Sequence, residues 1–505
     1  MAFDRLPARR AGIDTYQQPV AYLRADSAVC LAEGFEAQAQ VELIVRGRHV
    51  LAILHHVRSD WLRRDEIALS EAAWAMLGAA EGEDVEVRHP PQLASLAYLR
   101  GKVHGIRFDD VALHALMADV SQGRVSDIHL ASFVTVCAGG GLDLTETVAL
   151  TRAMVDVGER IDWGVAPVMD KHCIGGLPGN RTTLLVVPIV AACGAVMPKT
   201  SSRAITSAAG TADAMETLAP IGLDVAAMRR VVEREGGCIV GGSAARISPA
   251  DDMLIRVERP LNLDSEGLLV ASILSKKVGA GAQRVLIDLP VGPQTKVRTA
   301  AAAEALSRSL VAVGAEFGLQ VRSVLSDGFQ PVGRGIGPAL EALDVMAVLR
   351  REPDAPADLR DRALVLAGLL LEMAGKAASG AGLALARSVL DDGRALAKFI
   401  AICEAQGGLR VPPRAPHTHV LCAPVAGQAT AIDTRLAARA AKLAGAPRDP
   451  SAGAVMHVRV GERIAAGQPL FTLHAGSVGA LQYALGFLRA QPPVVHLAVD
   501  PFSTP

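Results

Sequence analysis

Residues 170–218 read DKHCIGGLPGNRTTLLVVPIVAACGAVMPKTSSRAITSAAGTADAMETL. A glycine-rich loop follows the first four residues, and a segment dense in hydroxyl groups, residues 200–207, lies near the end. Between them, residues 184–196 form an apolar run that is too short to cross a membrane, so we expect a buried helix. Glycines let backbone N–H groups approach an anion, hydroxyls donate hydrogen bonds to phosphate oxygens, and Lys or Arg neutralises the charge. The stretch therefore predicts two loops that face a single anion.

The same stretch resembles the thymidine phosphorylase and AMP phosphorylase family. The shared pattern is DKHxxGG, a glycine-containing turn with Thr-Thr, and then SSRAITSxAGTxDxxE. It continues in order with ASILSKK at residues 271–277 and VGPQTKV at residues 291–297, and it extends from about Leu96 to the C-terminus. The resemblance implies a pentosyltransferase that cleaves an N-glycosidic bond with inorganic phosphate as co-substrate, without a cofactor, in a homodimer or larger homo-oligomer. The substrate would be thymidine, giving thymine and 2-deoxyribose 1-phosphate, or alternatively AMP, giving adenine and ribose 1,5-bisphosphate.

Composition excludes several other classes. Lys and Arg number 51 against 52 Asp and Glu, and aromatic residues make up only 3%, so neither a general nucleic-acid binder nor a base-stacking platform is expected. The seven cysteines form no CxxC pair, which disfavours a zinc ribbon or a thioredoxin-like site. The start, MAFDRLPARR, lacks an apolar segment after its charges, so we predict no signal peptide and a cytoplasmic protein with reduced thiols.

The order of predicted elements indicates a multidomain α/β protein. At 505 residues the chain is long enough for about three or four domains. Strand-like runs come first, helical spacing follows, helix–strand alternation fills the middle, and short strands with glycine turns return at the end. We predict a β-rich N-terminal accessory domain at residues 1–90 and a helical domain at residues 92–160 with 250–280. A large α/β phosphate-binding domain is predicted at residues 165–245 with 283–412, and a C-terminal α+β strand-sandwich domain at residues 416–505.

Local patterns refine this outline. Alternating apolar residues at 41–45, a turn at 46–48 and an apolar run at 50–54 predict a β-hairpin. Asp143, with Glu146 three residues later, predicts a capping box that opens a helix, so the preceding Gly-Gly-Gly is interpreted as a helix C-cap and turn. The last domain resembles a lipoyl- or biotinyl-type sandwich but lacks a lysine at the expected tip, so we interpret it as structural.

The resemblance assigns phosphate ligands residue by residue: Lys171, Cys173, Thr183, Ser201 and Thr211. Cys173 departs from the thymidine-specific pattern, in which Ser stands at that position. A thiol is a poorer donor than a hydroxyl, so Cys173 would contribute weakly or leave phosphate to backbone N–H groups. A thiolate nucleophile is the alternative, but phosphorolysis requires no enzyme nucleophile.

The resemblance also assigns residues that would bind the nucleoside. AMP phosphorylases point to Gly176, Ser202, Arg203, Ala204, Ile205, Thr206, Ser207, Thr211, Ser272 and Lys296. Thymidine phosphorylases point to Ser272 and Lys276 at the base, together with an arginine that is either Arg256 or Arg259.

Two residues are candidates for protonating the departing base. Asp264 matches the donor of the AMP-type enzymes, and as a donor it needs a pKa well above the reference ~3.9, hence a poorly solvated pocket. Taken alone, Asp264 is equally an N-cap. His172 is the rival, because an unperturbed pKa of ~6.5 suits the role, although a histidine that only holds the loop by hydrogen bonds fits the pattern as well.

The choice between thymidine and AMP stays open at the level of sequence. The longer turn LPGNRTT, the segment SSRAITS and the N-terminal domain all have AMP-type character. An AMP enzyme must hold a 5′-phosphate and needs a second cationic site, for which Arg181 or Arg203 is a candidate.

Two other classes compete with phosphorolysis. A phosphoribosyltransferase of similar fold would need Mg²⁺ and an acidic pair near the phosphate loop, and Asp213 and Glu216 are the local candidates. A non-catalytic nucleotide sensor is the other, but Asn180 and Arg181 stand where GxxxxGK[ST] requires Gly and Lys. No histidine pattern has metal-ligand spacing, so we predict no metal site.

Overall fold

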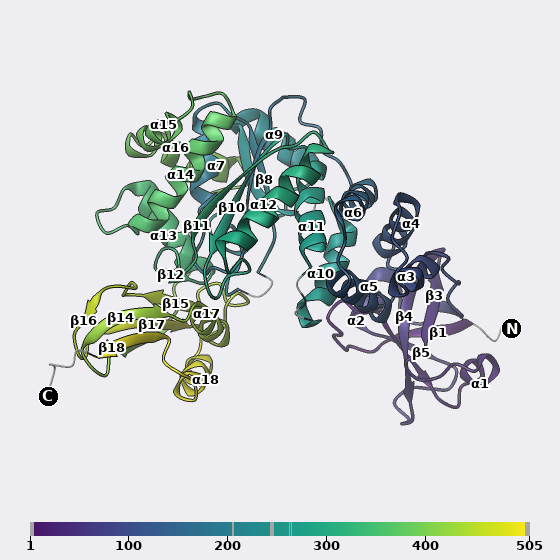
Figure 1. The fold of residues 1–505 in the computed structure, drawn as a ribbon. Coiled ribbons are helices and arrows are strands. Elements are labelled where there is room, and N and C mark those ends of the chain that lie inside the picture. The colour runs from purple at the N-terminus through teal and green to yellow at the C-terminus, as the bar shows by residue number, and fades with distance from the viewer. Residues whose placement is uncertain (1–4, 205–206, 243–246, 262, 264, 500–505) are drawn as a thin grey trace. The chain divides into compact units, whose positions relative to one another are not determined.

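The structure, a computed structural model, describes residues 5–204, 207–242, 247–261, 263 and 265–499. The chain divides into two compact units, Met1–Gly141 with Ala250–Ser265, and Leu142–Pro249 with Glu266–Pro505 (Figure 1). Each unit has hydrophobic cores of its own.

The first unit contains a closed β-barrel with the strand order β1-β5-β2-β4-β3-β6. The predicted hairpin is confirmed, because β3 and β4 pair antiparallel up to Val45 and Arg48 around a two-residue turn. Alternation along β3 places Val41, Leu43 and Val45 in the barrel core. The barrel elements are β1 (Arg5–Arg10), β2 (Val20–Arg24), α1 (Ala28–Glu33), β3 (Gln40–Val45), β4 (Arg48–Val57), β5 (Ile67–Leu69), α2 (Glu71–Leu77) and β6 (Asp84–Arg88).

Helices complete the first unit: α3 (Ser95–Val103), α4 (Asp110–Ser121), α5 (Asp127–Gly139) and α10 (Pro249–Leu261). The glycines after α5 form the predicted C-cap and turn, with Gly140 at the cap and Gly141 at φ 72°. The second unit begins with α6 (Leu144–Asp156), whose predicted capping box is confirmed. Asp143 accepts from the backbone N–H of Glu146 at 2.9 Å, and Glu146 accepts from the N–H of Asp143 at 3.2 Å.

Parallel strands form the centre of the second unit. One sheet has the order β11-β10-β7, and β8 pairs with β9 beside it. An isolated parallel bridge between Val168 and Val196 connects the two groups. The strands are β7 (Met169–Cys173), β8 (Met197–Ser201), β9 (Gly237–Gly241), β10 (Arg284–Val291) and β11 (Gln320–Asp327).

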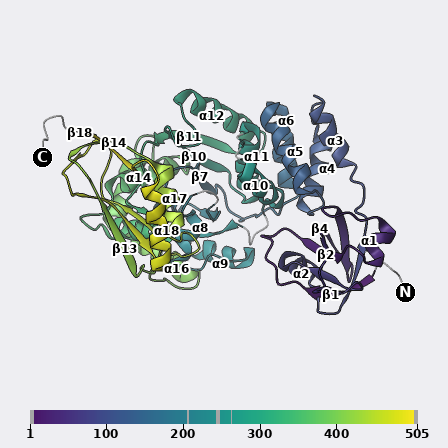
Figure 2. The ribbon, with the colours of Figure 1, turned by 90° about the horizontal axis from the view of Figure 1, so that it is seen from below.

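Helices cover both faces of this sheet (Figure 2). Leu286 of β10 belongs to the core that contains residues of α7 and α14. Val285 and Ile287 belong to the core that contains residues of α11 and α12. A strand buried on both faces has a nearly continuous apolar sequence, as the predicted strand VLIDLPVG has apart from Asp288. The helices are α7 (Thr183–Ala192), α8 (Thr211–Glu216), α9 (Val225–Glu235), α11 (Glu266–Gly279), α12 (Ala300–Ala315), α13 (Pro338–Arg350), α14 (Ala357–Met373), α15 (Gly382–Asp391) and α16 (Arg394–Ala405).

The apolar run at residues 184–196 forms α7, which confirms the predicted buried helix with one correction. The helix ends at Ala192, because Gly194 at φ 73° turns the chain, and Val196 already bridges to Val168 of the sheet. Within the described ranges, no helix is both long enough and apolar enough to span a membrane.

The C-terminal part of the second unit consists of two small sheets around one core, β12-β15-β17-β13 and β16-β14-β18. Strand β12 precedes α13 in the chain, so this part shares an element with the α/β body. Its elements are β12 (Gly335–Ile336), β13 (His417–Cys422), β14 (Gly427–Ile432), α17 (Thr434–Leu443), β15 (Gly453–Met456), β16 (Arg463–Ile464), β17 (Pro469–Ala475), α18 (Val478–Arg489) and β18 (Val495–Val499).

Candidate active site

The predicted motifs meet at the carboxyl edge of the parallel strands. Parallel strands end at a common edge, and ligands bind there in open α/β sheets. The glycine loop, residues 174–182, leaves β7. The hydroxyl loop, of which the structure describes residues 202–204 and 207–210, leaves β8. The proline loop, residues 292–299, leaves β10, the partner of β7. Motifs separated by more than a hundred residues therefore lie on neighbouring strands.

Lys171 is buried against the glycine loop with only 1% of its surface exposed. Its Nζ donates to Thr182 Oγ1 at 2.6 Å, and Thr182 donates to Asn180 Oδ1 at 3.3 Å. Burial lowers the pKa of Lys171 from the ordinary 10.5, while the nearby Asp288 opposes that shift. An ammonium has three N–H donors, so the single bond to Thr182 leaves donors for an anion at this edge.

Cys173 follows Lys171 at the end of β7, opposite Asp288 of β10 in the register. Its Sγ accepts from Asn180 Nδ2 at 3.1 Å, and the fully buried Asp288 accepts from Ser326 Oγ at 2.5 Å. Burial, reinforced by the Asp288 carboxylate, raises the pKa of the Cys173 thiol far above its usual range. A thiol held in this way stays protonated at neutral pH, which is the opposite of what a thiolate nucleophile needs.

His172 is half-buried on β7 among cationic side chains. Burial lowers its pKa well below the ordinary 6.5, and the charges of nearby lysines lower it further. Those lysines are Lys277, Lys199, Lys276 and Lys171. The imidazole is therefore neutral at physiological pH, so His172 can donate one hydrogen bond but holds no spare proton for a leaving base.

The lysines around His172 are organised by the buried Asp170. Its carboxylate lies 3.2 Å from Lys199 Nζ of β8 and 2.8 Å from Lys277 Nζ of α11. These charges lower the pKa of Asp170 although burial opposes the shift. One carboxylate thus joins β7, β8 and α11, the helix that carries Ser272 and Lys276.

The hydroxyl loop is closed by Asp213 at the start of α8. Its Oδ2 accepts from the backbone N–H of Ala204 at 2.7 Å and of Gly210 at 2.8 Å. Arg203 pairs with Asp213 at 3.1 Å and with Glu216 at 2.6 Å, and Glu216 consequently has a lowered pKa. Ser207 Oγ donates to the carbonyl of Ala209 at 2.8 Å, and Ser202 is exposed.

Two predicted phosphate ligands keep their hydroxyls available. The Oγ of Ser201, at the end of β8, is buried and has no hydrogen-bond partner in the described part of the chain. Thr183, the first residue of α7, is buried and makes no side-chain hydrogen bond to any residue that the structure describes. Buried hydroxyls are normally paired, so the unpartnered Ser201 Oγ can donate to a phosphate, and the N-terminus of α7 adds a favourable dipole.

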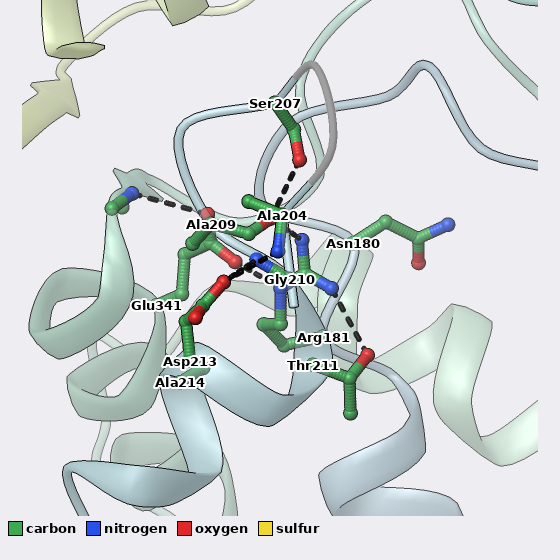
Figure 3. Close-up of polar contacts among 12 residues, drawn as sticks. Asn180, Arg181, Ala204, Ser207, Ala209, Gly210, Thr211, Asp213, Ala214 and Glu341 are labelled. Atoms are coloured by element: carbon green, nitrogen blue, oxygen red, sulfur yellow. Dashed lines mark hydrogen bonds and ion pairs between the residues drawn. The ribbon is translucent and has the colours of Figure 1, made fainter. Parts of the chain in front are cut away.

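Arg181 joins the glycine loop to the hydroxyl loop (Figure 3). Its Nε pairs with Glu341 of α13, one terminal nitrogen donates to Thr211 Oγ1 at 3.1 Å, and the other donates to the carbonyl of Ala209 at 2.8 Å. Thr211, another predicted phosphate ligand, is therefore held by Arg181.

The remaining predicted residues of the second unit lie on the glycine loop, the proline loop and α11. Gly176 has φ 103°, and a Cβ there would lie 3.2 Å from the backbone N of Lys296, so the glycine and proline loops are in contact. Lys296 itself is exposed. Ser272 and Lys276 lie one helical turn apart on α11, and Lys276 is close enough to lower the pKa of His172.

Asp264, Ile205 and Thr206 lie outside the described residues, as does the side chain of Arg259. Arg256 belongs to the first unit, where its guanidinium pairs with Asp127 of α5.

Sequence reasoning missed several residues of the site. Thr182, which bonds Lys171, and Lys277, the buried partner of Asp170, were not among the predicted residues. Asp288, Ser326 and Glu341 were not predicted at all. A signal existed for Asp288, because a lone acidic residue inside the apolar strand VLIDLPVG requires a buried partner.

We expect Cys173→Ser to retain phosphate-dependent activity within about threefold of the unaltered protein, because a hydroxyl is at least as good a donor as a protonated thiol. The measurement is kcat/KM for phosphate. A loss of about 10³-fold or more would instead identify Cys173 as a nucleophile.

Comparison with known proteins assigns the family. Three family models match the chain, described as "Glycosyl transferase family, helical bundle domain" at residues 96–158, "Glycosyl transferase family, a/b domain" at residues 165–396 and "Pyrimidine nucleoside phosphorylase C-terminal domain" at residues 429–491. A protein of Acidovorax sp. (strain JS42) named "Putative thymidine phosphorylase 2" is 62% identical over 497 residues, 98% of this chain and 97% of that protein. This chain belongs to the thymidine phosphorylase family. A family member from Polaromonas sp. (strain JS666), named "Putative thymidine phosphorylase", is 61% identical over 496 residues, with the same coverage.

Family membership confirms the resemblance and the pentosyltransferase class. Solved structures add a likeness of fold alone. Anthranilate phosphoribosyltransferase from Thermus thermophilus is 19% identical with a TM-score of 0.51, covering 61% of this chain and 98% of that chain. The acidic pair that such an enzyme would need here, Asp213 and Glu216, is bound to Arg203.

Proposed function

We propose that this protein is a thymidine phosphorylase that transfers the 2-deoxyribosyl group from thymine to inorganic phosphate. The observation that carries the proposal is the buried Lys171 ammonium, which has unused donors at the carboxyl edge of β7. Ser201 and Thr183 supply available hydroxyls on the neighbouring segments. The names of relatives at about 60% identity over nearly the whole chain support the same reaction.

In the proposed reaction a phosphate oxygen attacks C1′ of the deoxyribose, and the bond from C1′ to N1 of thymine breaks. The bonding pair leaves with the base, which then takes up a proton. Lys171 and the start of α7 hold the phosphate and balance its charge, so positioning and electrostatics supply most of the acceleration. Lys276 and the neutral His172 offer hydrogen bonds to the departing base, and Asp264 remains the proposed proton donor.

The charges of the loops favour a nucleoside over a nucleotide. The two arginines that could hold a 5′-phosphate, Arg181 and Arg203, are both paired with carboxylates. A 5′-phosphate would have to compete with Glu341 for Arg181. At Arg203 it would have to compete with Asp213 and Glu216. AMP is the second candidate substrate for one reason: Lys296 is exposed and has no ion pair among the described side chains.

We expect thymine release from thymidine to exceed adenine release from AMP at least about tenfold in kcat/KM, with both reactions dependent on phosphate. Thymine and adenine are measured by chromatography with and without phosphate. A parallel measurement with a chelator tests for the Mg²⁺ requirement of a phosphoribosyltransferase. A preference for AMP that disappears in Lys296→Met would establish the second candidate instead. Nucleoside binding without any consumption of phosphate would indicate a sensor.

A further inference from the structure

The guanidinium of Arg181 is the only side chain in the described residues that bonds both Glu341 and the end of the hydroxyl loop (Figure 3). Its bonds reach a carboxylate, a hydroxyl and a carbonyl in three directions. Only the planar fork of an arginine offers this set of donors, because a lysine has a single nitrogen. The buried position of Arg181 removes it from contact with bulk water.

Glu341 is anchored on its far side. Its Oε1 accepts from the backbone N–H of Gly337 at 3.1 Å, and its side chain is fully buried. Gly337 has φ 134°, and a Cβ there would lie 2.4 Å from the carbonyl of Ala452, so this turn is pressed against the C-terminal sheets. Burial raises the pKa of Glu341, and the charge of Arg181 opposes that shift.

The hydroxyl loop has a second contact with the same region. Ala208 is buried in the core of the C-terminal sheets together with Ile336 of β12. Asp213 closes the loop from the opposite end through Ala204 and Gly210. The segment that contains Ser201 and Thr211 is therefore held by Asp213, by Ala208 and by Arg181, and only Arg181 also belongs to the glycine loop.

We propose that Arg181 and Glu341 are a positioning pair, which fixes the hydroxyl loop against the glycine loop so that Thr211 and Ser201 converge with Lys171 on one phosphate. This inference rests on the proposed phosphorolysis and adds an activity-determining residue to it. It also assigns the C-terminal sheets a function, because they hold the Gly337 turn on which Glu341 depends.

Arg181→Lys tests the proposal, since lysine preserves the charge for Glu341 but cannot bond Thr211 and Ala209 as well. We expect KM for phosphate to rise about tenfold or more, because a shift of a binding group by about 1 Å can lower activity about 10²-fold. The KM for thymidine should change less than about twofold, and the melting temperature should stay near that of the unaltered protein. Thr211→Val added to Arg181→Lys should raise KM for phosphate little further, because both changes break the same bond.

Lys398→Gln is the matched control, because it removes a partly buried pair with Glu235 at 2.9 Å just before β9, at the amino end of the strands. It should leave both KM values unchanged. An unchanged KM for phosphate in Arg181→Lys, or equal rises in both KM values, would overturn the positioning role. Titration of inorganic phosphate by calorimetry separates the two proposals, since weaker phosphate binding in Arg181→Lys is expected even if the unaltered protein cleaves no nucleoside. Unweakened phosphate binding would count against the pair.

Discussion

Lys171→Met is expected to lower phosphorolysis by at least about 10³-fold while the protein stays folded. Methionine has nearly the length and volume of the lysine side chain, so it fills the buried space and removes only the charge. Thr182 loses its partner at 2.6 Å, and phosphate loses the buried ammonium that has unused donors near the end of β7. Lys171→Ala should lose as much activity but be less stable, because it also leaves a cavity. The readouts are base release, calorimetric phosphate binding and thermal unfolding.

Lys376→Met is the control, because Lys376 is an exposed lysine just after α14, and its activity should be unchanged. The pH dependence adds a second readout. Since burial lowers the pKa of Lys171 below the ordinary 10.5, the protonated form that binds phosphate is lost as the pH rises, earlier than for an exposed lysine. The kcat/KM for phosphate should therefore fall on the alkaline side below that value. Activity of Lys171→Met within about tenfold of the unaltered protein would refute the assignment of the phosphate site.

Sequence reasoning identified the motifs that lie at the carboxyl edge of β7 and β8 because each motif is a short, continuous stretch of the chain. The DKHC motif, the apolar helix and the hydroxyl segment follow one another along the chain, and each has a pattern that a short window reveals. The βα connection then places the end of a strand beside the start of a helix. The assignment of Lys171 and Ser201 to phosphate came from the family resemblance of these local motifs.

The supporting residues could not be predicted in the same way, because they depend on strand register and on long-range packing. Asp288 meets Cys173 only because β10 and β7 pair in one particular register. Glu341 reaches Arg181 across 160 positions of sequence, from α13, a helix that is buried along most of its length. The contacts of Thr182 with Lys171 and of Lys277 with Asp170 depend on side-chain directions, which helical spacing alone does not provide.

Asp170→Asn is expected to destabilise the second unit by about 3–5 kcal/mol at pH 7. The carboxylate is the shared partner of Lys199 at 3.2 Å and Lys277 at 2.8 Å, and all three side chains are buried. An asparagine cannot balance either charge, so each lysine must be buried as an uncompensated ammonium or in its neutral form, and both cost free energy. Urea unfolding measures the loss. Adding Lys277→Met should recover part of it, because a buried charge is then replaced by an apolar side chain of similar size.

The pH dependence of this loss follows from the two pKa shifts. The pKa of Asp170 is lowered by its lysines, so the stability it contributes is present above the ordinary 3.8 and disappears as the pH falls through the lower folded value. The pKa of Lys277 is lowered by burial, with Lys199 acting in the same direction, so a folded protein with neutral Lys277 gains stability as the pH rises toward the ordinary 10.5. The difference between Asp170→Asn and the unaltered protein should therefore be largest near neutral pH and shrink on both sides. Asp391→Asn is the control, because its pair with Arg360 at 2.7 Å is partly exposed and should cost less than about 1 kcal/mol. If both variants were equally stable, the ion pairs of Asp170 with Lys199 and Lys277 would not be a main support of the second unit.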